Sequence, residues 1–268
     1  MRVRYMIIDM DGVLWHGNTP LPGLVMFFET LAEYDIQFIL ATNNATRTPS
    51  QYQEKLAQFG VVVSREQVLN SAEATAGYLE QHYPAQSPVF VVGEDGLRQA
   101  VVARGFIVVT DDTAVRSLPT PPKIVVAGLD QTVCYDRLAT ASLLVGAGAD
   151  FIGTNPDPSF PSERGQVPGA GAIQAVITAT TGVTPKIIGK PERAMFDEAR
   201  RRMGAPIEGT VMVGDRLTTD IAGGNAAGLV TVMVLTGISQ REDLEGSAVR
   251  PDFIFEDIGE LAEALPEL

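Results

Sequence analysis

The sequence predicts an α/β fold in which a doubly wound parallel sheet forms the core and a second α/β domain is inserted into it. Short β-rich apolar runs alternate with helical patterns near both ends of the chain. Such alternation is typical of parallel sheets that are covered by helices on both faces. Between these two similar halves, the middle of the chain is interrupted by prolines and starts a new series of strands and helices.

Each end of the chain supplies strands and helices of its own. The apolar runs at 3–8 and 36–41 predict buried strands. Apolar side chains at helical spacing predict helices at 24–34 and 50–59, the second of which stops at Gly60. The C-terminal part repeats this order, with helices expected at 192–203 and 218–227 and strands at 210–213, 229–235 and 252–255.

The middle of the chain has its own alternation. Strands are expected at 89–92, 106–109, 124–127 and 150–153, and helices at 95–104 and 135–146. A Pro- and Gly-rich stretch at 154–169 predicts a long loop, and loops of that length inside compact domains are usually functional or mobile. We therefore expect residues 1–78 and 180–268 to form the core and 79–179 the insert. The alternative, one continuous sheet of about ten strands, is disfavoured by the two similar flanking halves.

The composition excludes several classes of function. The 268 residues include 20 Lys and Arg against 33 Asp and Glu, a formal net charge of −13. A surface this acidic repels nucleic-acid backbones and anionic membranes, so we expect neither as a partner. One cysteine, Cys134, and two histidines exclude an internal disulfide and His-rich metal sites, and nearly exclude a thiolate zinc site. A small anionic substrate remains compatible if its site is locally positive.

The first residues do not resemble a targeting signal. Asp9 interrupts the N-terminal apolar run, which is too short for a signal peptide. No stretch approaches the ~18 consecutive apolar residues of a membrane span. Together with the single cysteine, these features predict a protein of the reducing cytoplasm.

Polar residues stand where the predicted strands of the core end. Ligands of open parallel sheets bind beyond the carboxyl ends of the strands, so residues at those ends are expected to converge on one edge. They are Asp9, Asp11 and Gly12 after the first strand, Thr42 and Asn43 after the second, Asp215 and Asp220 after the strand at 210–213, and Lys190 before the helix at 192–203.

Three carboxylates of this edge need a counter-charge. Asp9 and Asp215 come directly after buried strands, where an unpaired carboxylate is costly. Asp11 precedes a glycine, so a simple turn is an alternative role for it. Repulsion among the three would be relieved by a divalent cation, and oxygen ligands of this kind suit Mg²⁺. Trp15 and His16, next to these acids, either line the mouth of the site or are structural.

The other polar residues of the edge each have two interpretations. Thr42 and Asn43 offer a hydroxyl and backbone N–H groups to a phosphate oxygen, or they form an ordinary turn. Asp220 either complements the start of a helix or orients Lys190 and the waters of a bound metal. Lys190 stands between glycine and proline near several acids, which favours charge neutralisation inside the site over a solvated surface position.

Four motifs follow one another in a fixed order along the chain. They are Asp9-Met10-Asp11-Gly12-Val13-Leu14, Thr42, Gly189-Lys190-Pro191, and Gly214-Asp215-Arg216-Leu217-Thr218-Thr219-Asp220. Together they resemble the motifs of the haloacid dehalogenase (HAD) superfamily, and no motif position departs from that pattern. One D-x-D-G alone is weak evidence, whereas four motifs in order, each at a predicted strand end, are strong evidence.

Further segments are similar to one branch of that superfamily, the NagD and p-nitrophenylphosphatase type. They are Leu21-Pro22-Gly23, Ala41-Thr42-Asn43-Asn44, Thr154-Asn155-Pro156-Asp157 and Pro168-Gly169-Ala170-Gly171. The branch also carries a large α/β cap between its second and third motifs, where the insert is expected here. The resemblance covers essentially the whole chain, and it implies a HAD-like Rossmannoid core with an inserted cap.

The resemblance implies a mechanism for the acids. Asp9 would attack phosphorus and form an aspartyl-phosphate, and Asp11 would protonate the leaving alcohol and later deprotonate the attacking water. The carboxyl at Asp11 excludes the dehalogenase branch, which lacks an acid there. Mg²⁺ would be held by the Asp9 side chain, the Asp11 backbone carbonyl and Asp215.

The resemblance also implies which residues bind the substrate. Those that would hold the phosphoryl group are Asp11, Gly12, Thr42, the Asn43 backbone and Lys190, with Asp220 in support. Asn155 and Asp157 would lie on the loop of the cap that faces the substrate. Closing the cap would exclude water and orient the leaving group.

These features predict a cytoplasmic, Mg²⁺-dependent phosphatase for small phosphorylated metabolites such as sugar phosphates, phosphoglycolate, nucleoside monophosphates or p-nitrophenyl phosphate. A phosphoryl-transferring mutase is one alternative, although mutases of this superfamily usually carry a smaller, helical cap. A non-catalytic phosphometabolite-binding protein is another, and the presence of both Asp9 and Asp11 argues against it. The sequence leaves the physiological substrate open, and also whether the chain forms a homodimer.

Overall fold

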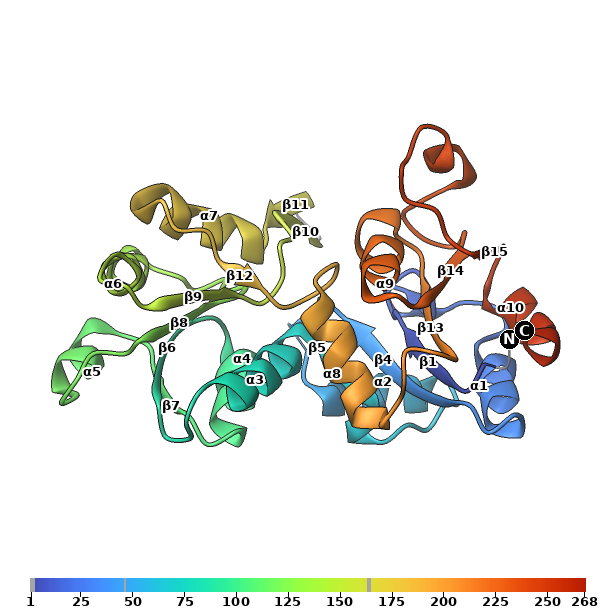
Figure 1. The fold of residues 1–268 in the computed structure, drawn as a ribbon, viewed down its shortest axis with the longest axis horizontal. Helices are drawn as coiled ribbons and strands as arrows, with labels where there is room; N and C mark the ends of the chain where they lie inside the picture. Colours follow the sequence, from blue (N-terminus) through green and yellow to red (C-terminus); the bar gives the residue numbers. More distant parts are fainter. Residues whose placement is uncertain (1–2, 46, 163–164) are drawn as a thin grey trace. The chain divides into compact units, whose positions relative to one another are not determined.

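The computed structural model describes residues 3–45, 47–162 and 165–268, without the side chains of 161 and 162. The chain divides into two compact units (Figure 1). The first unit comprises Met1–Thr42, Pro49–Leu69 and Lys190–Leu268, and the second comprises Asn43–Thr48 and Asn70–Gly189. Each unit has a sheet and a hydrophobic core of its own.

The first unit is built on a six-stranded sheet with the order β15-β14-β13-β1-β4-β5. The strands are β1 (Tyr5–Ile8), β4 (Gln37–Thr42), β5 (Val68–Asn70), β13 (Thr210–Gly214), β14 (Val230–Val234) and β15 (Phe253–Phe255). The pairs from β15 to β4 are all parallel, and β1 lies between β13 and β4. Parallel pairing brings the carboxyl ends of these strands to one edge, which is where motif residues follow them.

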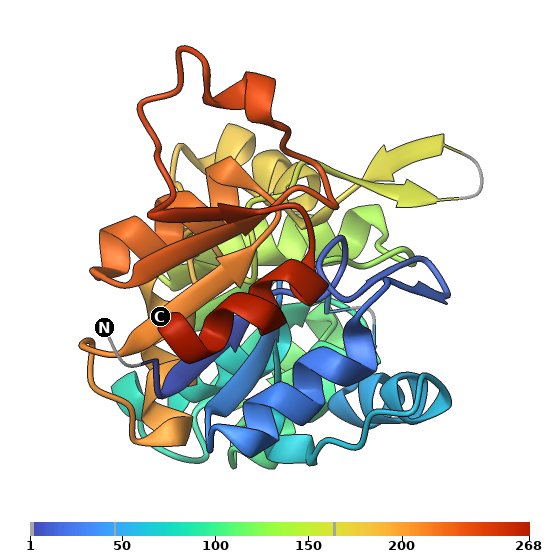
Figure 2. The ribbon, with the colours of Figure 1, turned by 90° about the vertical axis from the view of Figure 1, so that its right-hand side faces the viewer.

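Helices cover both faces of this sheet. They are α1 (Leu24–Glu33), α2 (Pro49–Gln58), α8 (Arg193–Met203), α9 (Ala222–Ala227) and α10 (Ile258–Ala264). Met6 and Ile8 of β1 belong to the core cluster that includes apolar residues of α1, α2 and α10. Alternate residues of a strand face opposite sides, so the cluster marks one face of the sheet. Figure 2 shows α1 and α10 in front of the strands.

The second unit has a five-stranded parallel sheet with the order β12-β9-β8-β6-β7. Its strands are β6 (Pro88–Val92), β7 (Ile107–Val109), β8 (Ile124–Ala127), β9 (Asp150–Gly153) and β12 (Lys186–Ile187), and its helices are α3 (Ser71–His82), α4 (Asp95–Ala103), α5 (Asp112–Ser117), α6 (Tyr135–Gly146) and α7 (Ala170–Thr181). Figure 1 shows α6 and α7 on one face and α3 and α4 on the other.

Short elements complete the described part of the chain. They are the hairpins β2 (Trp15–His16) with β3 (Thr19–Pro20) and β10 (Ser159–Ser162) with β11 (Gly165–Pro168), the 3-10 turns at Arg65–Gln67, Arg241–Leu244 and Leu265–Glu267, and a π-helical turn, η2, at Leu217–Ile221. The fold class predicted from the sequence, parallel sheets flanked by helices, is confirmed.

The stretch at 154–169 is not one long loop as predicted, because its second half forms the antiparallel hairpin β10–β11. The pairing reaches Pro168 opposite Ser159 at the end of the ladder, where a proline costs no central hydrogen bond. Helices α3 and α7 are two further elements that the sequence analysis does not predict. Most of α3 is buried, so it shows no clear apolar stripe, whereas α7 buries one face but also carries the apolar Val176 on its exposed side, which blurs the pattern.

The longer segment of the second unit runs from Asn70 to Gly189, and the insert expected from the sequence, 79–179, lies within it. Helix α3 lies within this unit, where Arg104, after α4, forms ion pairs with Glu73 and Glu80 of α3. At the other end, β12 pairs with β9 and so extends the sheet of the same unit.

Replacing Phe27 by alanine tests the packing of the first unit. Phe27 is fully buried on α1 and meets Phe28 edge-on with ring centroids 5.7 Å apart. Because the change leaves a cavity, we expect Phe27→Ala to lower the free energy of unfolding by about 3–5 kcal/mol, measured by urea denaturation. Val62→Ala, at a side chain that is 90% exposed, is the control and should change it by less than about 0.5 kcal/mol. Equal stability of the two variants would contradict the packing.

Candidate active site

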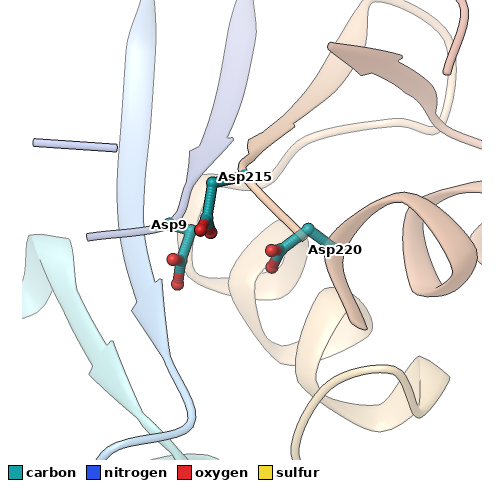
Figure 3. Close-up of side chains that lie close together, drawn as sticks. All are labelled: Asp9, Asp215 and Asp220. Carbon is teal, nitrogen blue, oxygen red and sulfur yellow. The ribbon is translucent and has the colours of Figure 1, made fainter. Parts of the chain in front are cut away.

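Three aspartates meet at the carboxyl edge of the first unit's sheet. Asp9 follows β1 and Asp215 follows β13, and these strands are adjacent with Ile8 opposite Val213. The Asp9 N–H donates to the Val213 carbonyl at 2.8 Å, which continues the ladder to the aspartate. Asp220 comes from the turn η2. Carboxylate oxygens of the three lie within 4.8 Å of one another, and all three residues are buried (Figure 3).

Lys190 is the cation of this acidic cluster. It lies just before α8, its side chain is 3% exposed, and its Nζ forms ion pairs with Asp9 and with Asp220, the latter at 2.7 Å. The Nζ also donates to the Ala41 carbonyl of β4 at 2.9 Å. One ammonium group among three carboxylates leaves an excess of negative charge in a buried place, so a further cation would stabilise the cluster.

Three glycines leave room for the carboxylates. A Cβ on Gly237 would lie 1.8 Å from Asp215 Oδ2, and one on Gly12 would lie 2.6 Å from the same atom. A Cβ on Gly214 would lie 2.2 Å from the Asp220 Cβ. Since real Cβ atoms essentially never come within 3.0 Å of another heavy atom, any side chain at these positions would push an aspartate out of the cluster.

The segment after β14 also holds the site, and the sequence analysis did not include it. The Ile238 N–H donates to Asp215 Oδ2 at 2.7 Å, and the Thr236 hydroxyl donates to the Gly12 carbonyl at 2.6 Å. The Ser239 hydroxyl accepts from the Leu217 N–H at 3.0 Å. The signal for this segment is its position, because Thr-Gly-Ile-Ser at 236–239 follows a buried strand as the other motifs do.

The buried charges shift one another's protonation. Burial raises the pKa of the Asp9 carboxyl well above its usual value, and the charges of Asp220 and Asp215 add to this against the opposing effect of Lys190. Burial and the charge of Asp220 raise the pKa of Asp215 to about 6. Burial alone would lower the pKa of Lys190, but the charges of Asp220 and Asp9 outweigh it and hold that pKa above its usual value. The ammonium group therefore stays charged at neutral pH.

The cluster fits a divalent cation by the chemistry of its donors. Asp9, Asp215 and Asp220 offer only oxygen ligands, and Mg²⁺ is typically bound by one or two carboxylates together with water and substrate phosphate. The carboxyl pKa values of Asp9 and Asp215 are raised by burial first and by the neighbouring aspartate charges second, so ionisation of the cluster is costly. A doubly charged ion removes that penalty.

The other sequence-predicted residues of the first unit have different surroundings. Asp11 is exposed and is not a member of the buried cluster; its Oδ1 accepts a hydrogen bond from Trp15 Nε1 at 2.8 Å. Gly12 lies against Asp215 with a φ of +87°, a conformation that favours glycine. Thr42 is the last residue of β4, beside β1, and is buried.

Three sequence-predicted residues, Asn43, Asn155 and Asp157, belong to the second unit and contact one another there. Asn155 Nδ2 donates to the Asn43 carbonyl at 3.0 Å, and Asn43 Nδ2 donates to Asp157 Oδ2 at 3.4 Å. The Ser71 hydroxyl, at the start of α3, donates to the same Asn43 carbonyl at 2.7 Å. The segment that follows Thr42 is thus fixed by the second unit's own side chains.

The chain belongs to the haloacid dehalogenase-like hydrolases. A family model described as haloacid dehalogenase-like hydrolase matches residues 6–107, and a second, HAD-hydrolase-like model matches 187–261. The chain is 39% identical over 262 residues to the acid sugar phosphatase of Staphylococcus aureus, a match that covers 98% of this chain and 96% of the relative.

Solved structures place the chain within one branch of that family. The p-nitrophenyl phosphatase from Archaeoglobus fulgidus is 32% identical with a TM-score of 0.90, and covers 99% of this chain and 100% of its own. NagD from Escherichia coli is 33% identical with a TM-score of 0.88, covering 97% of this chain and 98% of its own. These findings confirm the superfamily and the NagD and p-nitrophenylphosphatase branch predicted from the motifs.

A further neighbour carries a metal. The glycerol phosphate phosphatase from Mycobacterium tuberculosis, solved in complex with magnesium, is 33% identical with a TM-score of 0.87, covering 98% of this chain and 78% of its own.

Among the residues that the structure describes here, no helix combines the length and apolar character that a bilayer crossing requires.

Gly237→Ala tests the steric argument. The added methyl group would overlap Asp215 Oδ2, so we expect at least a ~10-fold loss of Mg²⁺ affinity by isothermal titration calorimetry. Gly146→Ala is the matched control, since its Cβ would meet nothing within 4 Å. Unchanged affinity in the Gly237 variant would show that Asp215 does not bind the ion.

The raised pKa of Asp215 predicts a pH-dependent stability of the metal-free protein. Because the folded state holds this proton up to about pH 6 and the unfolded chain releases it near 3.8, the associated stability is present below the lower value and lost as pH rises through about 6. At about pH 7.5, Asp215→Asn should be more stable than the wild type by on the order of 3 kcal/mol.

Thermal denaturation in a chelating buffer from about pH 4 to about pH 7.5 measures this difference. Millimolar Mg²⁺ should restore the wild type at the higher pH and leave Asp215→Asn nearly unchanged. A gap between the two proteins that stays constant with pH would contradict the role given to Asp215.

Proposed function

We propose that this protein is a Mg²⁺-dependent phosphatase of small phosphate monoesters and that Asp9 is its nucleophile. The observation that carries this proposal is the position of the Asp9 carboxylate, which lies at a sheet edge, is paired with a buried ammonium group and is close to two further carboxylates. Membership of the haloacid dehalogenase-like hydrolases and likeness to named phosphatases support the same activity.

Lys190 prepares both the nucleophile and the site. Its ion pair with Asp9 favours the ionised carboxylate that a nucleophile must be, and its hydrogen bond to Ala41 fixes the ammonium group against β4. Lys190, the Thr42 hydroxyl and the Asn43 backbone N–H are proposed to bind the phosphoryl oxygens, where fixed donors stabilise the charge of the transition state. Asp220 holds Lys190 in place from its other side.

Mg²⁺, held by the side chains of Asp9 and Asp215 and the backbone carbonyl of Asp11, would supply the positive charge that lets an anionic carboxylate approach an anionic phosphate. Asp9 attacks phosphorus and becomes the aspartyl-phosphate. Asp11 gives its proton to the departing alcohol and then takes one from the water that hydrolyses the intermediate. Asp11 is exposed, as a residue that exchanges protons with substrate and water must be.

The second unit is proposed to act as the cap, with Asn155 and Asp157 facing the leaving group. The named relatives act on sugar phosphate, p-nitrophenyl phosphate and glycerol phosphate, so the proposed substrate is a small phosphorylated metabolite. The net charge of −13 argues against nucleic acids as substrates. A cytoplasmic location and a homodimer stay predictions, the second to be tested by light scattering after gel filtration.

Phosphate release from a metabolite panel, with Mg²⁺ and with a chelator, tests the proposal. The wild type should release phosphate only with the metal, and Asp9→Asn should lower kcat at least about a thousandfold because the amide cannot form the acyl-phosphate. Asp197→Asn, on α8 with a side chain 46% exposed, is the control and should retain activity. Full activity of Asp9→Asn would overturn the proposal.

Two other outcomes favour the alternative functions. Isotope exchange between phosphosugars without net phosphate release would identify a mutase. Binding of a phosphosugar without turnover across the whole panel would identify a non-catalytic binding protein.

A further inference from the structure

Trp15 is the one tryptophan of the chain, and its side chain is fully buried. The indole belongs to the core of the first unit, yet its single polar atom is turned to the motif that follows β1. Nε1 donates to Asp11 Oδ1 at 2.8 Å, the usual length of such a bond to a carboxyl group. A residue of the core thus contacts the proposed acid directly.

The indole is held from several sides. Its ring stacks on Tyr52 with centroids 6.3 Å apart, and Phe59 packs on it at 6.1 Å. The largely buried Lys55 Nζ lies 4.0 Å from the ring centroid and donates to the Gly17 carbonyl at 2.6 Å. These contacts leave the ring little freedom to turn.

The backbone around Asp11 is tied to Trp15 as well. The Gly12 N–H donates to the Trp15 carbonyl at 2.9 Å, which closes the short loop between the two residues. The positive charge of Lys55 over the indole face draws electron density from the ring and makes its N–H a stronger donor. Backbone and side chain therefore fix the same carboxyl group.

We propose that Trp15 is a positioning residue for Asp11 and that it decides which carboxyl oxygen carries the transferable proton. This inference rests on the proposed phosphatase activity. An indole N–H can only donate, so the oxygen that faces it, Oδ1, acts as an acceptor. The indole therefore leaves Oδ2 as the oxygen of Asp11 that we assign to the proton transfer.

The consequence for the reaction is specific to its proton transfers. As an Asp9 oxygen bonds to phosphorus, the bond from phosphorus to the leaving oxygen breaks, and the proton on Asp11 Oδ2 moves to that oxygen. In the second step Oδ2 receives a proton from the attacking water, whose oxygen bonds to phosphorus and releases Asp9. Without the indole N–H, the proton distributes over both oxygens and both rotamers of Asp11.

The leaving group of the substrate separates positioning from packing. An alkyl alkoxide must be protonated as it departs, whereas 2,4-dinitrophenolate departs without help. We expect Trp15→Phe to lower kcat/KM about tenfold for glycerol phosphate and less than about twofold for 2,4-dinitrophenyl phosphate. The parameter kcat/KM depends only on the steps up to the cleavage of the bond to the leaving group. The later hydrolysis of the aspartyl-phosphate therefore does not affect the comparison. Phe28→Leu, which removes ring contacts elsewhere in the same core and keeps the indole N–H and its neighbours, is the control and should affect both substrates alike.

A second variant covers the case in which Trp15→Phe does not fold. Because the chain has one tryptophan, biosynthetic replacement of tryptophan by benzothienylalanine changes this site alone, keeping the ring's size while sulfur replaces the N–H. The same selective loss on glycerol phosphate is expected. If either variant lowers kcat/KM by the same factor for both substrates, or leaves both unchanged, the proposed role of Trp15 is wrong. A wild type that releases phosphate from neither substrate would instead overturn the proposed function.

Discussion

The first unit is organised around one electrostatic constraint: among the residues that the structure describes, three carboxylates share a buried edge with a single ammonium group. Parallel pairing of β1 and β13 brings Asp9 and Asp215 together, and the η2 turn adds Asp220. Water is largely excluded from this place, so repulsion among the acids is only weakly screened. Lys190 reduces this repulsion through its ion pairs with Asp9 and Asp220. Helix α8 begins shortly after Lys190, so its position determines where the ammonium group lies.

Local structure at the edge serves the same constraint. Positions 12, 214 and 237 carry no side chain, so the carboxylates can approach each other and the backbone closely. The segment after β14 then orients Asp215 through the backbone N–H of Ile238, which only a proline at that position would remove. The site is therefore built as much by the backbone and by missing side chains as by the acids, which is why it depends on several distant segments of the chain.

The strands of the first unit and the acids that follow them could be predicted from the sequence, whereas some helices could not. The clarity of the apolar pattern explains the difference. Asp9 and Asp215 follow strands that are mostly apolar and buried, and strands of this kind give the clearest pattern. Helix α3 lacks a recognisable apolar stripe because most of it is buried, and the stripe of α7 is blurred because Val176, on its exposed side, is apolar too.

Side-chain contacts between distant segments were beyond the sequence for another reason. The bond between Lys190 and Ala41 and the role of Thr236 depend on strand order and on where each loop returns. For Asp220 the sequence allows a role at the start of a helix or the orientation of Lys190, and its ion pair with Lys190 favours the second. For Trp15 the sequence allows either a role at the site or a structural role. In the structure its ring packs in the core, while its Nε1 donates to Asp11.

The burial of the lone tryptophan has a practical consequence. Indole emission reports on the polarity and the charges next to the ring, and here the neighbours include a lysine ammonium group over its face and the carboxyl group of Asp11. Trp15 is thus an intrinsic fluorophore beside the loop that follows β1. No other tryptophan in the 268 residues contributes to the emission. Ligand arrival at that loop can be followed optically in the unlabelled protein.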